Sequence, residues 1–376
     1  MIIRKVDIWH LKLGFRFLCK HKLAAYHSSD NLVVKVTTDE GVRGFGEGIP
    51  RDFVTGESLE NSLEYLEKEW APAILGQNLA SPADLGACIR ELQERHPPEK
   101  APGAFCALEM ALLDAGGRTW CRPVSDLLGS PGSSPLIYSA VLPLTAEAEL
   151  HHFLQLVKTL GIRQVKVKVG EEHDFEILAA ARRELGPEAD LRVDANGAWT
   201  PEEAIARIRD MTPLRLSAVE QPVAKEDFLG LRQVQEAVAL PIIADESVCT
   251  LADAQRLIEL GACKIFNIRL SKVGGLTRAL RLKELAAAAG LRCQLGCHVG
   301  ETSLLAAAGR HFAQTQKDLV YLEGSYAPFL LTQDVVQDPV SFGPGGAAPP
   351  LTGPGLSVHV MERALEELGV FRLSLS

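Results

Sequence analysis

Beyond residue 135, short runs rich in valine, isoleucine and leucine alternate with longer segments whose apolar residues recur every three or four positions. The short runs predict buried β-strands, and the longer segments predict amphipathic α-helices. Strands and helices that alternate in this way predict an α/β fold with a parallel (β/α)8 TIM barrel, which we place at residues 135–340. The predicted strands are 136–142, 164–169, 191–194, 217–220, 241–245, 264–269, 292–297 and 318–323.

The first 130 residues follow a different pattern. The stretch NLVVKVTTDEGVRGFGEG predicts two strands around a turn, and helical periodicity then extends from about Leu59 to Gly117. We therefore expect an α+β domain over residues 1–130, followed by a linker at GSPGSSP. A last helical pattern lies beyond a Pro- and Gly-rich stretch, and we expect residues 345–376 to return to this domain.

Two lysines occupy one face of the second predicted strand of the barrel, in the stretch QVKVKVG. Lys166 and Lys168 point to the same side because residues two apart in a strand share a face. On a solvated strand, paired lysines are ordinary. On a strand that is covered on both faces, two ammonium groups need a functional or structural reason.

An acidic residue ends each of the next three predicted strands. They are Asp194 in RVDANGAW, Glu220 in AVEQP and Asp245 in IIADES, spaced about one βα unit apart. The carboxyl ends of barrel strands meet at one mouth, so we expect these carboxylates to converge there. One such acid alone is typical of a helix N-cap. Three in succession indicate an all-oxygen site that suits Mg²⁺ better than zinc.

The composition excludes several classes of protein. The chain has 376 residues, 47% of them apolar, and a net charge of −9 without a basic run, which argues against nucleic acid or a membrane as partner. We see neither a signal peptide nor a run of transmembrane length and expect a cytoplasmic protein. The eight cysteines form no CxxC pair, which indicates reduced thiols.

The motifs KVKVG, DANGAW, EQP, ADES and KVGG, in this order and spacing, resemble the enolase superfamily in its branch of muconate-lactonizing enzymes and dipeptide epimerases. The stretch GVRGFGEG, followed by Thr55-Gly56-Glu57, is similar to the N-terminal capping domain of that family. The resemblance implies an α+β cap, completed by the C-terminal segment, over a modified barrel. It also implies a small-molecule carboxylate substrate bound to Mg²⁺, and we expect a homo-oligomer.

The resemblance implies a role for each of these site residues. Asp194, Glu220 and Asp245 would hold Mg²⁺, Lys168 would be the acid/base, and Lys166 would bind the substrate carboxylate and favour the neutral form of Lys168. The α-proton of a carboxylate leaves at neutral pH only if the enolate is stabilised, which a divalent cation and an ammonium group both do. A second cation and partial burial favour the neutral form that a basic lysine needs.

The end of the sixth predicted strand departs from the family pattern. The epimerase and cycloisomerase branch has a second basic lysine there, but this chain has Arg269. A guanidinium stays protonated in proteins and cannot accept a proton. A single base favours a lyase (dehydratase) or cycloisomerase, with Arg269 binding an anionic group or the enolate. Alternatively, Arg269 pairs structurally with Asp245 or Glu246, or Lys272 becomes the second base after a register shift.

Further candidates lie on the last two strands. His298, in GCHVGET, stands where mandelate racemases have a catalytic histidine, and it is either a general acid or base or a hydrogen-bonded structural residue. Glu323, in YLEGS, resembles the glutamate on the last strand of those racemases and is a candidate substrate contact. Dipeptide epimerases have an Asp-x-Asp there that holds a substrate ammonium, so this chain has only half of that device.

Two loops of the cap would close over the barrel mouth, at residues 14–30 and 49–57, and set substrate selectivity. We take Tyr26 and Arg51 as candidate substrate contacts. Basic residues of the first loop favour a substrate with a second anionic or polar group; they are Arg16, Lys20, His21 and Lys22.

Three functions stay open. The leading one is a Mg²⁺-dependent lyase or cycloisomerase that removes an α-proton with Lys168. The second is a racemase or epimerase of a dipeptide, an acylated amino acid or a related carboxylate, with His298 or Lys272 on the opposite face. The third is a catalytically idle relative that only binds. Intact ligands and an intact lysine pair argue against it, because a cluster of buried charge is costly to keep without use.

Overall fold

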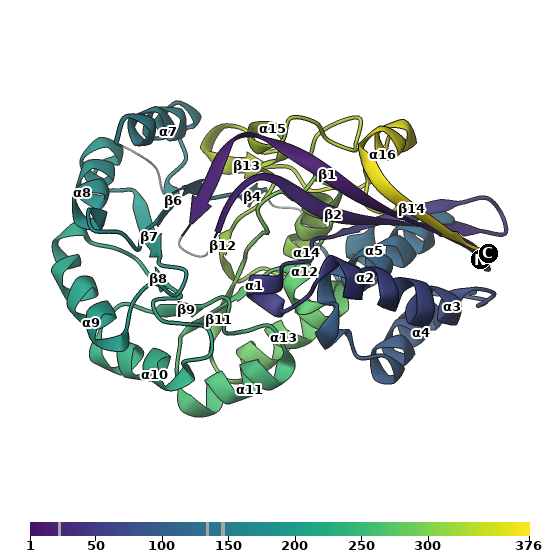
Figure 1. Cartoon of the computed structure of the whole chain (residues 1–376), viewed down its shortest axis with the longest axis horizontal. Helices are drawn as coiled ribbons and strands as arrows, with labels where there is room; N and C mark the ends of the chain where they lie inside the picture. The colour runs from purple at the N-terminus through teal and green to yellow at the C-terminus, as the bar shows by residue number, and fades with distance from the viewer. Residues whose placement is uncertain (22–23, 133–134, 144–146) are drawn as a thin grey trace.

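The computed structural model describes residues 1–21, 24–132, 135–143 and 147–376 of the chain. Its larger part is an eight-stranded parallel sheet that curls into a barrel inside a ring of helices (Figure 1). The N–H of Ser139 donates to the carbonyl of Leu322 at 2.7 Å and links the first strand to the last. The predicted TIM barrel is therefore confirmed. Its strands are β5 (Ala140–Leu142), β6 (Gln164–Lys168), β7 (Asp190–Asp194), β8 (Val219–Glu220), β9 (Ile242–Ala244), β10 (Ile265–Ile268), β11 (Arg292–Leu295) and β12 (Leu319–Leu322).

Four of the barrel helices, α9, α10, α11 and α14, begin at side-chain caps. At α9, the Thr200 hydroxyl accepts from the N–H of Glu203, and the Glu203 carboxylate accepts from the N–H of Thr200, with Pro201 at the first helical position. The helices are α7 (Glu147–Leu160), α8 (Asp174–Leu185), α9 (Pro201–Asp210), α10 (Phe228–Ala237), α11 (Leu251–Leu260), α12 (Leu270–Val273), α13 (Leu276–Ala288), α14 (Ser303–Thr315) and α15 (Ala327–Leu330). No helix of the described segments has both the length and the apolar composition to cross a membrane.

The first predicted strand, 136–142, is two strands in the structure. β4 (Leu136–Ile137) pairs antiparallel with β13 (Ala347–Ala348), and only β5 joins the barrel. Between them, the N–H of Tyr138 donates to the carbonyl of Gly346 at 2.8 Å. Gly346 has φ +75°, and a Cβ there would lie 2.2 Å from the carbonyl oxygen of Tyr138, so only glycine permits this approach.

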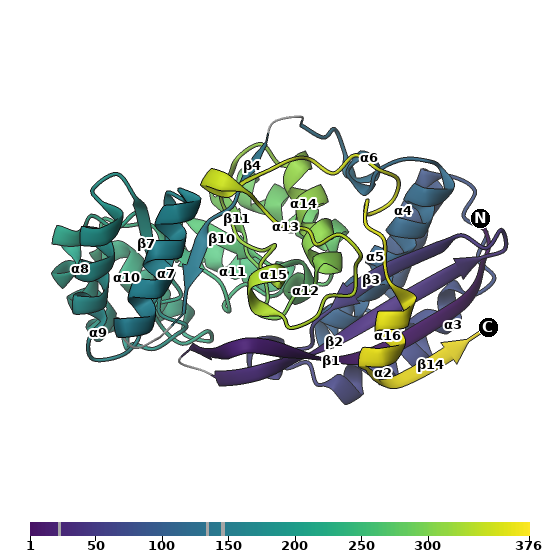
Figure 2. The same ribbon diagram turned by 90° about the horizontal axis from the view of Figure 1, so that it is seen from above.

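A four-stranded antiparallel sheet forms the cap, with α5 against one face and α16 against the other (Figure 1). Its strand order is β14-β1-β2-β3, so the last strand of the chain lies beside the first and both termini lie at the same end of the molecule (Figures 1 and 2). The predicted return of the C-terminal segment to the cap is therefore confirmed, whereas the domain boundaries stay predictions. The elements are β1 (Ile3–His21), β2 (Ala24–Thr38), β3 (Arg43–Gly48), β14 (Gly369–Leu375), α1 (Asp52–Thr55), α2 (Leu59–Tyr65), α3 (Ala71–Ile74), α4 (Pro82–Arg95), α5 (Pro102–Thr119), α6 (Val124–Leu128) and α16 (Glu362–Leu368).

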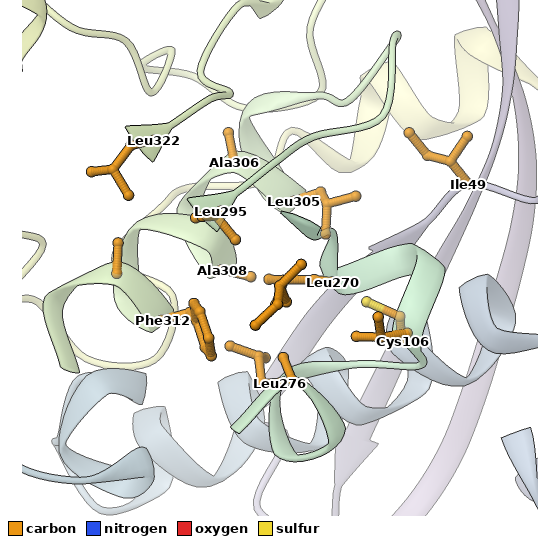
Figure 3. Close-up of a cluster of buried hydrophobic side chains, with 14 of the residues drawn as sticks. Ile49, Cys106, Leu270, Leu276, Leu295, Leu305, Ala306, Ala308, Phe312 and Leu322 are labelled. Atoms are coloured by element: carbon orange, nitrogen blue, oxygen red, sulfur yellow. The ribbon is translucent and has the colours of Figure 1, made fainter. Parts of the chain in front are cut away.

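Glycines at every second position of β3 set the distance between the sheet and α5. A Cβ would lie 2.2 Å from the carbonyl oxygen of Ala111 at Gly44, 2.0 Å from that of Ala107 at Gly46 and 1.8 Å from that of Gly103 at Gly48. The strand and the helix therefore touch backbone to backbone. The apolar core continues from α5 into the barrel helices, where Cys106 lies near Leu270, Leu276 and Leu305 (Figure 3).

Two buried carboxylates of the cap complete barrel helices. Glu109 on α5 accepts from the N–H groups of Leu276 and Thr277 at the start of α13, where Gly275 provides no side-chain cap. Glu47 on β3 accepts from the N–H groups of Thr302 and Leu305 at the start of α14, at 3.0 and 2.9 Å. Helix N-termini leave their first N–H groups without intrahelical partners. The cap therefore provides acceptors that α13 and α14 lack.

Residues 14–30, which the sequence suggests as a loop, are largely a continuation of β1 and β2 as a hairpin. Figure 2 shows this hairpin reaching from the sheet to the barrel. It contacts the segment after α15, because the N–H of Thr332 donates to the carbonyl of Gly14 at 3.0 Å. Lys22 lies outside the described residues, as do the side chains of Lys20 and His21.

Candidate active site

The two lysines of β6 point into the barrel, whereas Val165 and Val167 alternate with them, point to the other face and are buried. The Nζ of Lys166 lies 2.9 Å from the Glu323 carboxylate, 3.1 Å from that of Glu220 and 3.4 Å from that of Asp194. The Nζ of Lys168 donates to Asp194 Oδ2 at 3.0 Å and to Asn196 Oδ1 at 2.7 Å. Burial alone would lower the pKa of Lys166, but Glu220, Glu323 and Asp194 outweigh burial and raise it.

Three fully buried carboxylates end adjacent strands, as the sequence predicts. Strand register places Lys168 opposite Asp194 and Asp194 opposite Glu220, and Asp245 follows β9 directly. Glu220 also accepts from the side-chain amides of Asn267 and Gln294, both at 2.9 Å. Burial would raise the pKa of Asp194, yet Lys168, Lys166 and Arg269 outweigh burial and lower it, so this carboxylate is ionised.

The donor set fits a hard divalent cation, although the side chains are not gathered around one point. In the described chain, no three His, Cys, Asp or Glu side chains are arranged to hold a metal ion. The three carboxylates instead pair with ammonium and guanidinium groups. Asp245 Oδ2 is buried, accepts no hydrogen bond within the described chain, and has the Arg269 guanidinium beside it. Buried carboxylate oxygens without a donor need a nearby cation, and oxygen ligands are those that Mg²⁺ prefers.

Arg269 directly follows β10, pairs with Asp245 and also borders the central cavity. Its Nη2 lies 3.9 Å from a carboxylate oxygen of Glu220 and 3.9 Å from one of Glu246. Lys272, the alternative base, is fully buried and donates to the carbonyl and the carboxylate of Asp245. It is not among the described residues that line the cavity, which argues against Lys272 as the second base.

Sequence reasoning missed Arg192, a fully buried residue inside the barrel. Its Nη2 donates to Glu323 Oε1 at 2.7 Å, and its guanidinium lies 4.1 Å from the ring centroid of Tyr321. Glu323 is thus held between Arg192 and Lys166. The signal was present, because Arg192 precedes Asp194 by two positions and so shares its face of β7.

A cavity of about 1510 Å³ opens above these side chains and extends under the cap. Tyr26 and Arg51 of the cap line it together with Lys166, Lys168 and Glu323. It is thus lined by residues of both domains. Asn196 and Glu246, which the sequence did not single out as functional, also line it and are joined by a 3.0 Å hydrogen bond.

Arg51 is fixed in place by the cap and by a barrel loop. Its Nη2 donates to the Ser29 hydroxyl and to the carbonyl of Val299, both at 2.8 Å, and its guanidinium lies 5.4 Å from the ring centroid of Tyr26. The two cap segments that the sequence suggests as loops, 14–30 and 49–57, are therefore in contact with each other. These contacts orient Arg51 at the cavity wall.

His298, after β11, is buried and lines the same cavity. Neither ring nitrogen has a hydrogen-bond partner within the described chain, which argues against the structural interpretation. Burial, with Arg269, Arg51 and Lys272 nearby, holds the pKa of His298 well below its usual range, so the imidazole is neutral. Its backbone N–H donates to Glu301 at 2.6 Å, which fixes the turn that carries the ring.

Comparisons with known proteins cover both parts of the chain. The family model described as "Mandelate racemase / muconate lactonizing enzyme, N-terminal domain" matches residues 19–129, and the one described as "Enolase C-terminal domain-like" matches residues 149–364. A hydrophobic dipeptide epimerase of Enterococcus faecalis V583 is 33% identical over 321 residues, which are 85% of this chain and 89% of the relative.

Solved structures agree with these matches. The dipeptide epimerase of Enterococcus faecalis V583, complexed with Mg and the dipeptide L-Leu-L-Tyr, has a TM-score of 0.87 at 31% identity and covers 96% of this chain and 100% of its own. The N-succinyl Arg/Lys racemase of Bacillus cereus has a TM-score of 0.92 at 28% identity, with 100% of both chains covered. The 2-chloromuconate cycloisomerase of Rhodococcus opacus 1CP has a TM-score of 0.90 at 27% identity, with 99% and 100% covered.

Proposed function

Because the chain belongs to the mandelate racemase / muconate lactonizing enzyme family of the enolase superfamily, we propose that it is a Mg²⁺-dependent racemase or epimerase of an amino acid derivative. The substrate has a free carboxylate, as an N-acyl amino acid or a dipeptide does. The reaction removes the α-proton from one face of the carbon and returns a proton to the other face. This proposal replaces the one-base lyase or cycloisomerase as the leading interpretation.

The observation that carries the proposal is a second proton carrier at the cavity. Lys168 projects from β6 and His298 follows β11, with strands β7 to β10 between them in the sheet. The two side chains therefore approach the cavity from well-separated strands. A neutral imidazole without a hydrogen-bond partner can accept a proton, which Arg269 cannot do, and the imidazolium that forms can return it.

Asp194, Glu220 and Asp245 are the residues that would hold Mg²⁺, and Arg269 would then no longer be the counter-cation of Asp245. Bound Mg²⁺ supplies stabilisation of the negative charge that develops on the substrate carboxylate when the α-proton leaves. Lys166 keeps its positive charge beside the cavity and stabilises the same developing charge.

Lys168 and His298 transfer the protons to and from the α-carbon. Lys168 Nζ takes the proton on one face, and Asn196 orients this amine through its 2.7 Å hydrogen bond. His298 must first be protonated to the imidazolium, which then delivers a proton from a ring nitrogen on the other face and becomes the neutral imidazole again. In the reverse direction the roles exchange, so each enantiomer is deprotonated by a different residue.

The test is proton exchange in D₂O with both enantiomers of N-acyl amino acids and dipeptides, followed by NMR and chiral chromatography. We expect deuterium at the α-carbon together with inversion. Lys168→Ala should retain exchange only for the enantiomer that His298 deprotonates, and His298→Asn only for the other one. His173→Asn is the matched control, because His173 lines the cavity but is exposed.

A one-base lyase or cycloisomerase is the second candidate, and Arg269 favours it because it cannot be a base. That mechanism gives a different pattern with the same variants. Only one enantiomer would then exchange its α-proton, Lys168→Ala would abolish this exchange, and His298→Asn would leave it at the wild-type rate. This result would contradict the two-base proposal.

A further inference from the structure

The central cavity continues away from the charged cluster into a second, apolar compartment. This compartment, the apolar annex, lies between the end of β5 and helices α7 and α8. The annex residues and Lys168 line one and the same cavity. The annex is lined by Leu142, Leu150, Phe153, Leu156, Leu160 and Ile177.

The hairpin of the cap covers part of this annex. Phe17 lines the cavity, and its ring meets that of Phe153 on α7 edge to face, with the centroids 5.6 Å apart. Phe17, Leu18 and Leu156 are nevertheless 37%, 47% and 39% exposed. Large apolar side chains that stay partly exposed around a concave surface indicate a surface that an apolar ligand completes.

Most carboxylate oxygens at the charged end of the cavity already have partners. Glu323 is held by Lys166 and Arg192, and Glu301 accepts from the backbone N–H of His298. Glu246 accepts from Asn196 through Oε1, and its buried Oε2 has no hydrogen-bond partner in the described chain. A free amino group near the α-carbon would therefore have Glu246 as its one uncommitted partner among these three carboxylates.

We propose that the apolar annex binds the acyl chain of an N-acyl amino acid, so that the preferred substrates carry long aliphatic acyl groups. This inference rests on the proposed racemase or epimerase function and names its substrate class. An amide nitrogen carries no charge, and therefore it needs no carboxylate partner. From Leu150 to Leu160, α7 presents about 15 Å of wall, which is longer than a short acyl group can cover.

The experiment measures binding and turnover separately. Binding is measured by calorimetry with N-acetyl-, N-hexanoyl- and N-decanoylglycine, which have no stereocentre and are not racemised. Turnover is measured with the same acyl groups on L- and D-alanine. Each added methylene should lower Kd about fourfold until the annex is filled, because burying a methylene is worth about 0.8 kcal/mol.

A matched pair of variants locates the effect. Leu156→Glu should weaken binding of the decanoyl compound at least tenfold and leave the acetyl compound unchanged. Leu229→Glu makes the same change on α10 at a residue that is 63% exposed and does not line the cavity, so it should change neither. Both residues are partly exposed, so neither change places a charge in the core.

The outcomes separate this inference from the function on which it rests. Chain-length-dependent binding without racemisation would overturn the proposed function and leave the annex assignment standing. Racemisation with a Kd that is flat across the acyl series, or unchanged in Leu156→Glu, would overturn the annex assignment and leave the function standing.

Discussion

His311 predicts a specific dependence of stability on pH. It lies on α14, fully buried, and its Nδ1 accepts from the backbone N–H of Ser125 on α6 at 3.3 Å. Burial lowers the pKa of His311 to about 4, from 6.5 for an ordinary histidine. The unfolded chain therefore binds a proton at a pH where the folded protein does not. This histidine contributes stability that is complete above pH 6.5 and is lost as the pH falls toward 4.

The size of the effect follows from the two pKa values. Their difference corresponds to about 3 kcal/mol in the free energy of unfolding, of which about 2.5 kcal/mol is lost by pH 4.5. In His311→Asn, the side-chain oxygen replaces Nδ1 as the acceptor for Ser125 and does not titrate. The smaller asparagine side chain packs less well, so the variant is less stable than wild type at pH 7. Its free energy of unfolding should, however, fall by about 2.5 kcal/mol less than that of wild type between pH 7 and pH 4.5.

The assay is equilibrium unfolding by urea, followed by tryptophan fluorescence, at several values between pH 7 and pH 4.5. The measured quantity is the difference in free energy of unfolding between wild type and variant as a function of pH, since other groups titrate equally in both. The exposed His359 provides the control His359→Asn, which should follow the wild type. Parallel curves for wild type and His311→Asn would refute the reasoning.

Gly46→Ala should destabilise the protein by about 3 kcal/mol in urea unfolding, because the new Cβ would lie 2.0 Å from a backbone oxygen of α5. Gly86→Ala inside α4 is the control and should stabilise the protein by about 1 kcal/mol. Equal effects of the two changes would show that the close approach of β3 to α5 is not the cause. Arg192→Met leaves Lys166 as the one described cationic partner of Glu323. We expect it to lower the free energy of unfolding by about 3 kcal/mol and to lower kcat at least tenfold. An unchanged kcat would show that Arg192 does not position Glu323 for catalysis. Chelation by EDTA should abolish activity reversibly without changing the far-UV circular dichroism. Mg²⁺ at 100 times its Kd should add about 2.7 kcal/mol to the free energy of unfolding. A thermal unfolding midpoint that does not change with Mg²⁺ would contradict the assigned ligands.

The barrel and the positions of its charged residues could be predicted because they depend on local patterns. Each strand is a short apolar run, and Asp194, Glu220 and Asp245 stand where such runs end. Parallel strands bring their carboxyl ends together regardless of loop detail. The placement of these acids in one cluster therefore needed no knowledge of long-range contacts.

Other features depend on partners that are distant in sequence. The split of 136–142 follows from the close approach of Gly346 to Tyr138, and no local signal marks it. Arg192 is explained only by Glu323, on the other side of the barrel. The pairing of Arg269 with Asp245 was one of two open interpretations, since sequence alone does not show which way a guanidinium turns.

The carboxylates of Glu47 and Glu109 have a consequence for how the chain folds. Each belongs to the cap in sequence but completes a barrel helix in space. A barrel formed without the cap would leave the first N–H groups of α13 and α14 without these acceptors, each at a cost of about 1–3 kcal/mol. The first part of the chain must therefore be present before the barrel can become fully stable, and the two domains should unfold in a single cooperative transition.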